Sequence, residues 1–209
     1  MEFGFRGKVK AVIKKVYSNP AINGESIEPN ANNPINTYTY FFNQNGNIDS
    51  AKTEYTFPSG ESNGYKTIYK FENLRKSEWV AINETGEKLL IGKIKWASDK
   101  EYTESVYDAS DNAKYEVTTF LNDSFRIIKT KIKAFDGLGN TTQDDIQEFD
   151  LDKQLNAVSY KTTHNASGQT EVTDYEYLKM ADFLNPKELI MTKREKGTKT
   201  LIRLTYIYY

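Results

Sequence analysis

The chain has 209 residues, a formal net charge of −1, no cysteine and a single histidine. A charge this close to zero gives no field that would hold nucleic acid, so we expect no nucleic-acid partner. The lack of cysteine excludes disulfides, thiol nucleophiles and cysteine-ligated metals. No apolar run approaches the roughly 18 residues of a transmembrane segment, so none is expected. The 15 Tyr and 11 Phe supply the aromatic area that disordered chains lack, so we expect the chain to fold.

One short phrase recurs along the chain: an apolar or aromatic residue, then Asn or Asp, two spacers, usually Gly, and a polar residue. Several copies lack the Gly, notably at Asp111 and Lys153. Clear copies are FNQNGN from Phe42, INETGE from Ile82, YDASDN from Tyr107, FDGLGN from Phe135, FDLDKQ from Phe149 and HNASGQ from His164. Weaker copies begin at Phe57, Phe71, Trp96 and Leu121, and the second positions of successive copies lie 11 to 15 residues apart. Asn or Asp opens a tight turn, and Gly or Asn tolerates the positive φ that follows, so each copy predicts a hairpin turn.

The segments between these turns predict β-strands of about ten residues. Residues 37–42, 93–96, 113–121 and 203–209 are rich in Tyr, Thr, Val and Ile, which favour strands. Turns this short join antiparallel neighbours, so the sequence predicts an all-β fold, a long antiparallel meander of about a dozen strands. A large twisted sheet curls, so we expect a curved single sheet or incomplete barrel, formed as a single domain over residues 1–209.

Two segments break this rhythm. Residues 18–34 hold three of the five prolines and many asparagines, which predicts a mobile excursion longer than a hairpin loop. Residues 178–186 read LKMADFLNP, which predicts one helical turn that ends at Asn185 and Pro186.

The turn phrase resembles the YD repeat of the RHS superfamily. The stretch GKVKAVIKKVY at residues 7–17, the glycine-asparagine turns, and KREKGTKTLIRLTYIYY at residues 193–209 together resemble secreted or periplasmic lipoproteins of Bacteroidetes, mostly of uncharacterised function. The resemblance implies a β-meander, an extracytoplasmic location in the periplasm or at the cell surface, and a lipid anchor on a cysteine of the precursor. The natural reading frame is then expected to continue upstream of Glu2 into an apolar segment that ends in this cysteine. It implies no active site.

The candidate catalytic and metal-binding residues have simpler interpretations. His164 occupies the aromatic position of a turn phrase, so we expect it to have a structural role. Three acidic pairs would suit calcium or a glycosidase: Asp108 with Asp111, Asp144 with Asp145, and Asp150 with Asp152. Most of these residues lie in or beside turns, where Asp is expected anyway. We therefore expect no catalytic residue, no metal and no cofactor.

Four aromatic residues are the candidate ligand-binding residues: Tyr38, Tyr40, Trp79 and Trp96. Their rings would stack on sugars or line an apolar groove, or they would pack across strands as part of the sheet itself. The sequence thus favours a non-enzymatic extracytoplasmic binding or scaffold module whose partner is an unknown glycan, peptide or lipid. Two alternatives stay open, a carrier that holds a lipid or other apolar ligand in its curved sheet and a carbohydrate-active enzyme that uses turn carboxylates.

Overall fold

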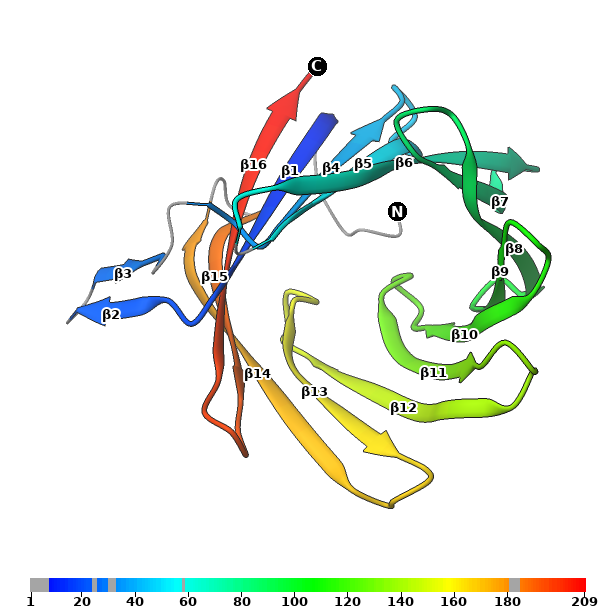
Figure 1. Ribbon diagram of the computed structural model, residues 1–209. Helices are drawn as coiled ribbons and strands as arrows, with labels where there is room; N and C mark the ends of the chain where they lie inside the picture. Colours follow the sequence, from blue (N-terminus) through cyan, green and yellow to red (C-terminus); the bar gives the residue numbers. More distant parts are fainter. Residues whose placement is uncertain (1–7, 24–25, 30–32, 58, 181–184) are drawn as a thin grey trace. The chain divides into compact units, whose positions relative to one another are not determined.

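The computed structural model describes residues 8–209 apart from 24–25, 30–32, 58 and 181–184 (Figure 1). All regular secondary structure in these residues is β-strand, so the all-β prediction is confirmed. The strands are β1 (Val9–Ser18), β2 (Ala21–Asn23), β3 (Ser26–Glu28), β4 (Asn36–Phe42), β5 (Ile48–Thr56), β6 (Ser62–Glu72), β7 (Arg75–Ile82), β8 (Lys88–Ser98), β9 (Glu101–Asp108), β10 (Ala113–Leu121), β11 (Ile127–Phe135), β12 (Thr141–Leu151), β13 (Ala157–His164), β14 (Thr170–Met180), β15 (Pro186–Lys193) and β16 (Lys199–Tyr208).

The strands from β4 to β16 pair in chain order, and β1 pairs antiparallel with both β16 and β4. This is the strand order of a closed barrel, so the predicted meander is confirmed. We had expected an open curved sheet or an incomplete barrel, whereas the first strand of the meander pairs with the last. The sequence could not show the closure, because it depends on a first strand that meets both β4 and the last strand.

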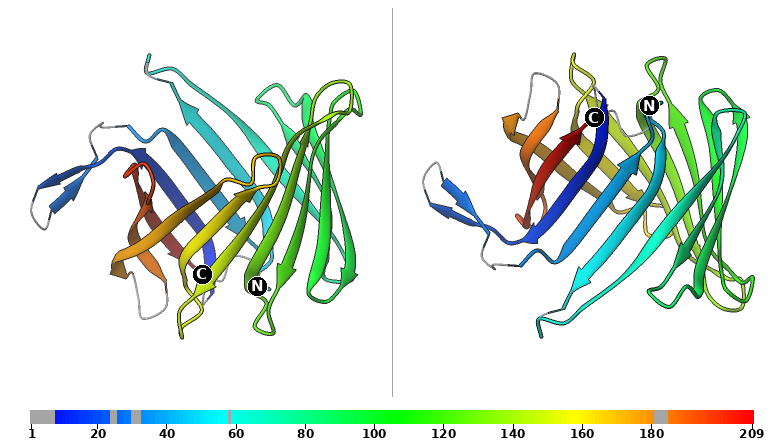
Figure 2. Two further views of the ribbon diagram at one scale, coloured as in Figure 1. Left: turned by 90° about the horizontal axis from the view of Figure 1, so that it is seen from below. Right: turned by 90° about the horizontal axis from the view of Figure 1, so that it is seen from above.

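The chain divides into two compact units. Unit 1 contains residues 3–67 and 173–209, and unit 2 contains residues 68–172. Both divisions fall inside long strands, β6 and β14, and no linker separates the units in the sequence. The single domain stays a prediction. Figure 2 shows the strands of unit 2, in green and yellow, running side by side with short turns at both ends.

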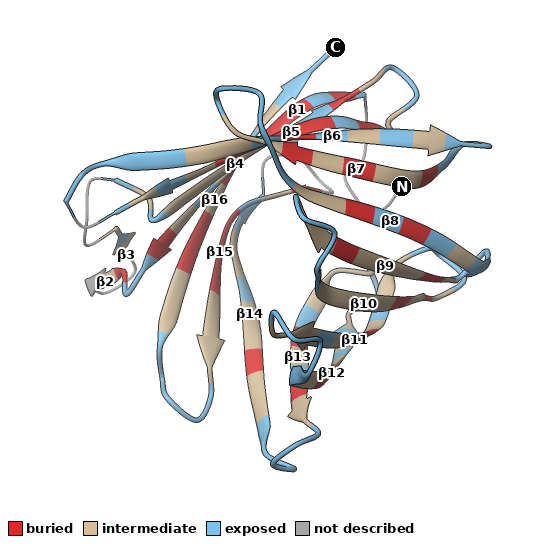
Figure 3. Ribbon diagram, turned by 45° about the vertical axis from the view of Figure 1, so that its right-hand side comes forward, coloured by how far each residue is buried: buried red, intermediate tan, exposed pale blue. Residues whose placement is uncertain are grey.

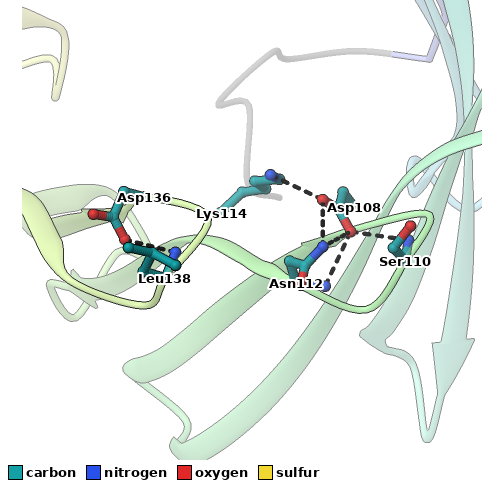
Figure 4. A network of polar contacts seen from close by, with 6 residues as sticks. All are labelled: Asp108, Ser110, Asn112, Lys114, Asp136 and Leu138. Carbon is teal, nitrogen blue, oxygen red and sulfur yellow. Dashed lines mark hydrogen bonds and ion pairs between the residues drawn. The ribbon is translucent and has the colours of Figure 1, made fainter.

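The recurring phrase forms the turns, as predicted. In the turns that open at Asn122 and Asp136, the backbone N–H of the opening residue donates to the carbonyl four residues later, at 2.9 Å in both cases. The turn that opens at Asp108 closes in the same way, and Oδ1 of this residue also accepts the backbone N–H of Ser110 at 2.9 Å and of Asn112 at 3.0 Å (Figure 4). The opening carboxylate or amide therefore satisfies backbone donors that a tight turn leaves unpaired.

The copy of the phrase predicted from Phe149 was placed two residues too early. The turn after β12 opens at Asp152, whose backbone N–H donates to the carbonyl of Asn156, whereas Asp150 still lies in the strand. Leu155 has a φ of 66° and occupies the glycine position of this turn. Because a bulky residue stands where glycine was expected, no glycine marked the true position in the sequence.

The two irregular segments have different outcomes. Residues 18–34 include the short hairpin of β2 and β3, which Figure 1 shows as a separate pair of strands. The predicted excursion therefore contains regular structure, and its mobility stays a prediction. Within residues 178–186, Leu178 to Met180 belong to β14 and Pro186 begins β15. The middle of the predicted helical turn, residues 181–184, lies outside the described residues.

In unit 1 the buried side chains gather on β1, β5, β15 and β16 (Figure 3). Val12 and Leu201 are fully buried, and Ile190 is almost so. Leu201, Ile190 and Tyr17 form one apolar cluster, against which Ile27 of β3 also packs. The hairpin of β2 and β3 thus covers one face of these strands, and the tyrosines of β4 lie on the other face.

Candidate ligand-binding face

The four predicted ligand-binding residues lie in different units. Tyr38 and Tyr40 belong to β4 in unit 1, and Trp79 and Trp96 belong to β7 and β8 in unit 2. Within each unit, the contacts of these rings differ.

Trp79 and Trp96 are engaged in packing. Trp79 is 7% exposed and lies directly opposite Gly92 on β8, where a Cβ would be 2.2 Å from its indole ring. The indole N–H of Trp96 donates to the carbonyl of Lys76 at 2.9 Å, and its ring centroid lies 4.7 Å from that of Tyr102. These contacts favour the second interpretation of the two tryptophans, in which their rings pack across strands. We therefore base the candidate site on Tyr38 and Tyr40.

Tyr38 and Tyr40 are two residues apart on β4, so both point to the same face of the strand. Their rings are nearly parallel, with centroids 6.3 Å apart and an interplanar angle of 6°. Tyr55 of β5 lies opposite Asn36, which places it on this same face, and the ring of Tyr65 lies 6.1 Å from that of Tyr55. We call this set, together with Lys14, the tyrosine face: Lys14, Asn36, Tyr38, Tyr40, Tyr55 and Tyr65.

Lys14 is the residue that the sequence analysis missed. It lies opposite Tyr38 on β4 and opposite Leu204 on β16, and its Nζ is 5.5 Å from the centre of the Tyr38 ring. The side chain is half-buried, and this burial lowers the pKa of Lys14. Among the described residues, no carboxylate forms an ion pair with Lys14. In the sequence Lys14 shares its two-residue period with the apolar Val12 and Val16, but Lys15 shares its own with Ile13 and Tyr17, so the alternation does not single out Lys14.

The hydroxyls of Tyr38 and Tyr40 stay protonated at neutral pH. Burial, with repulsion from Tyr38 and Tyr65, raises the pKa of Tyr40 to about 12. Burial and Tyr65 also raise the pKa of Tyr38, although its hydroxyl accepts a hydrogen bond from Asn36 Nδ2 at 3.3 Å, which acts in the opposite direction. The face therefore combines one ammonium group with neutral hydroxyls that can donate hydrogen bonds.

The acidic residues considered from the sequence have structural partners. Hydrogen bonds from Lys114 and Asn112 hold the pKa of the turn-capping Asp108 well below its usual range (Figure 4). Asp145 is buried and bonds to His164, which gives that histidine a structural contact. In the part of the chain that the structure describes, no group of three or more His, Asp or Glu residues is placed to hold a metal.

The comparisons with known proteins show the fold of the chain but no family. No protein-family model matches the chain, and neither does any curated protein. Crystal structures of a porin-like protein from Bacteroides uniformis and of one from Bacteroides vulgatus have similar folds, with a TM-score of 0.54 each, at 10% and 12% identity. The likeness covers 96% and 95% of this chain and 98% of each of those chains. At this identity it shows the fold alone. No helix among the described residues is long and apolar enough to span a membrane.

Proposed function

We propose that this chain is a non-enzymatic extracytoplasmic binding module whose ligand contacts the tyrosine face of unit 1. The observation that carries this proposal is the half-buried Lys14 beside the stacked rings of Tyr38 and Tyr40, with no carboxylate partner among the described residues. A partly desolvated cation without a counter-ion costs free energy, so a fold retains one at such a place most readily when a ligand supplies the opposite charge.

The two similar structures are described as porin-like, which raises the question of whether this sheet would contact lipid. In unit 2 the sheet face opposite to the one that carries Trp79 bears lysines: Lys93, Lys95, Lys129, Lys131, Lys133 and Lys161. Nearly all of them are exposed. A lysine against lipid tails at the middle of a bilayer costs about 2–4 kcal/mol, so this face is suited to water. It supports a module that works in an aqueous compartment.

An aqueous extracytoplasmic compartment, with a lipid anchor on the precursor, agrees with the resemblance at both ends of the chain. The periplasm or the cell surface is therefore the location that we propose. Purifying the native protein from fractionated cells and finding a lipid on its N-terminal cysteine would test this, and a cytoplasmic unmodified protein would contradict it.

The two alternative functions have less support. A carrier for a purely apolar ligand would gain nothing from a lysine and four hydroxyl groups on the face that it presents. The enzyme alternative needs two free carboxylates that face one substrate, yet Asp108 and Asp136 cap turns through hydrogen bonds to the backbone. Asp150 accepts the hydroxyl of Ser159 at 2.7 Å, so it too has a structural partner.

A ligand screen tests the binding function. Glycans, peptides and charged or neutral lipids are added to the full chain, hits are found by thermal shift and measured by calorimetry, and each bound compound is recovered for mass spectrometry. We expect an unchanged ligand whose affinity falls with Tyr40→Phe and Tyr40→Ala. The matched control is Tyr160→Ala, because Tyr160 packs on Phe149 in unit 2 at 5.6 Å between ring centroids.

Three results would overturn this assignment. A ligand that depends on Trp79 or Trp96 and not on Tyr40 would place the site in unit 2. A ligand that is hydrolysed, with activity lost on changing Asp108 or Asp150, would make the protein an enzyme. A screen in which every class of compound fails to bind would remove the binding function.

A further inference from the structure

We propose that the tyrosine face recognises an organic anion, whose carboxylate, phosphate or sulfonate group binds Lys14 and whose apolar body contacts the rings of Tyr38 and Tyr40. This inference rests on the proposed binding function and names the class of ligand. Three features of the face lead to it: its charge, its hydrogen-bond donors and its stacked aromatic rings.

Among the described residues, no acidic side chain compensates the charge of Lys14. The side chains that share its face on the two neighbouring strands are Tyr38 and Tyr40 of β4 and Ile202 and Leu204 of β16, none of which is acidic. The next strand, β5, adds Ala51 and Thr53 on this face. The other ionisable groups close to it are therefore tyrosines.

The cations nearest to Lys14 in sequence and register are Lys15 and Arg203, and both point to the opposite face of the sheet. Lys15 lies opposite Arg203, whose guanidinium bonds to Glu188 on the face covered by β3. Lys15 is exposed, whereas Lys14 is half-buried among aromatic and aliphatic groups. The two neighbouring lysines of β1 therefore differ in their surroundings while sharing the same charge and strand, and this makes Lys15 the natural control.

The donors of the face favour an anion over a neutral or cationic ligand. Ammonium and phenol groups both donate hydrogen bonds, and a donor that meets an ionised acceptor forms a bond about twice as strong as one between neutral groups. The pKa of Tyr40 is about 12, so its hydroxyl keeps its proton throughout the pH range in which Lys14 carries its charge. A cationic ligand would be repelled by Lys14, and a neutral ligand would leave its charge uncompensated.

The rings of Tyr38 and Tyr40 determine the apolar part of the ligand. With an interplanar angle of 6°, the rings of Tyr38 and Tyr40 form a stacked aromatic pair along β4. Val12 and Leu204 adjoin Lys14 on the same face and are buried apolar side chains. An apolar or aromatic body beside the anionic group would bury area against these rings, which gives the site preference for organic anions over inorganic ones.

Two fluorescent dyes with the same ring system separate the charge from the apolar body. Anilinonaphthalene sulfonate carries a sulfonate, and N-phenylnaphthylamine is its uncharged counterpart. We expect the sulfonate dye to bind the full chain at least roughly tenfold more tightly, as a charge-assisted hydrogen bond predicts. Lys14→Met should make the two affinities equal, Lys14→Arg should keep the preference, and Lys15→Met should leave it unchanged.

The preference for the sulfonate dye over the uncharged dye should also depend on pH. The sulfonate stays ionised across the alkaline range, so only the protein's charge changes there. Because burial lowers the pKa of Lys14 below 10.5, the preference should be lost on raising the pH at a lower value than for an ordinary lysine. It should persist to higher pH in Lys14→Arg, since the guanidinium stays charged.

The outcomes distinguish this inference from the function on which it rests. If both dyes bind equally and weaken together in Tyr40→Ala, the face binds ligands but does not select anions, so the inference is overturned and the binding function stands. If Lys15→Met abolishes the preference as completely as Lys14→Met, general surface charge explains it and the inference fails. If neither dye binds, the inference is overturned, and the ligand screen decides the binding function separately. Circular dichroism in the near-ultraviolet confirms that each variant is folded.

Discussion

Trp79 and Gly92 are direct partners on β7 and β8, and a Cβ on Gly92 would lie 2.2 Å from the indole nitrogen. The indole ring therefore occupies the space that any larger residue would need. We expect Gly92→Ala to lower the free energy of unfolding by about 1–3 kcal/mol, the usual cost of overpacking a filled site. Equilibrium unfolding in urea measures this change.

Gly137→Ala is the control for this substitution. A methyl group on Gly137 would have no atom within 4 Å, and this residue is not among the glycines with positive φ. We therefore expect Gly137→Ala to raise the free energy of unfolding by about 0.4–1 kcal/mol, because alanine lowers the entropy of the unfolded chain. In addition, Trp79→Leu should reduce the penalty of Gly92→Ala, because the smaller side chain leaves room for the methyl. Equal penalties at the two glycines would contradict the packing that we describe.

The local parts of the fold could be predicted from the sequence because each turn carries its own chemistry. Asn43 and Asp136, for example, each bond to backbone N–H groups two and four residues later, so the signal lies within five consecutive residues. This spacing was enough to predict antiparallel strands and their approximate lengths. Where Phe125 or Leu155 takes the left-handed position instead of glycine, the signal weakened, and one turn was misplaced.

The closed order of strands and the tyrosine face could not be predicted in this way. Both depend on the register of β1 against β4 and β16, strands that no local turn connects to it. Tyr38 and Tyr40 were proposed because aromatic residues stand out in a sequence, whereas Lys14 was one of several lysines in its strand. Its difference from Lys15 lies in the face to which it points, and the sequence alone left that face unassigned.

A buried acid in unit 1 makes stability depend on pH. The carboxylate of Glu188 is 6% exposed and lies 2.6 Å from Arg203 Nε and 2.9 Å from Lys179 Nζ. Burial by itself would raise the pKa of Glu188, but the hydrogen bonds and charges of Lys179 and Arg203 outweigh it and lower this pKa. The ionised carboxylate therefore stabilises the fold above its unfolded pKa, about 4.3, and this contribution is lost as the pH falls through the lower folded value.

Glu188→Gln tests this relationship. The difference in urea midpoint between the native chain and this variant should be largest at neutral pH and should shrink as the pH falls below the unfolded pKa. Glu84→Gln, at an exposed position in the turn after β7, is the matched control and should change little at either pH. A difference that stays constant down to strongly acidic pH would show that Glu188 contributes through packing and not through its charge.

The pair of His164 and Asp145 gives a prediction for unit 2. His164 Nδ1 lies 2.8 Å from Asp145 Oδ1 across neighbouring strands, and Gln143 Nε2 donates to the other carboxylate oxygen at 2.6 Å. Asp145 is 5% exposed, so loss of the imidazole would leave a buried acceptor with one partner fewer. We expect His164→Ala to lower the free energy of unfolding by about 1–3 kcal/mol.

A double-mutant cycle with Asp145→Ala measures whether the two residues act together. Because the imidazole has no carboxylate to meet once Asp145 is replaced, His164→Ala should then cost much less than it does in the native chain. The four chains are compared by urea unfolding at one pH. Strictly additive effects would mean that the contact contributes nothing to stability.

Two exposed leucines in turns of unit 2 should respond in opposite ways to replacement by glycine. Leu74 is 82% exposed and has a φ of 65°, directly after Asn73 with a φ of 51°, in the two-residue turn between β6 and β7. Leucine in this left-handed conformation costs about 1–2 kcal/mol, whereas Asn-Gly is the pair that such a turn prefers. After allowing for the backbone freedom of glycine in the unfolded chain, we expect Leu74→Gly to raise the free energy of unfolding by about 0.5–1 kcal/mol.

Leu138 is the matched control because it is 90% exposed in a turn but is not among the residues with positive φ. Leu138→Gly has no strain to relieve and adds only unfolded-state entropy, so it should lower the free energy of unfolding by about 0.5 kcal/mol. Both leucines expose most of their apolar surface, so lost packing contributes little to either result. If both variants are destabilised to the same extent, the left-handed strain at Leu74 is absent in solution, and the turn there does not have the conformation described.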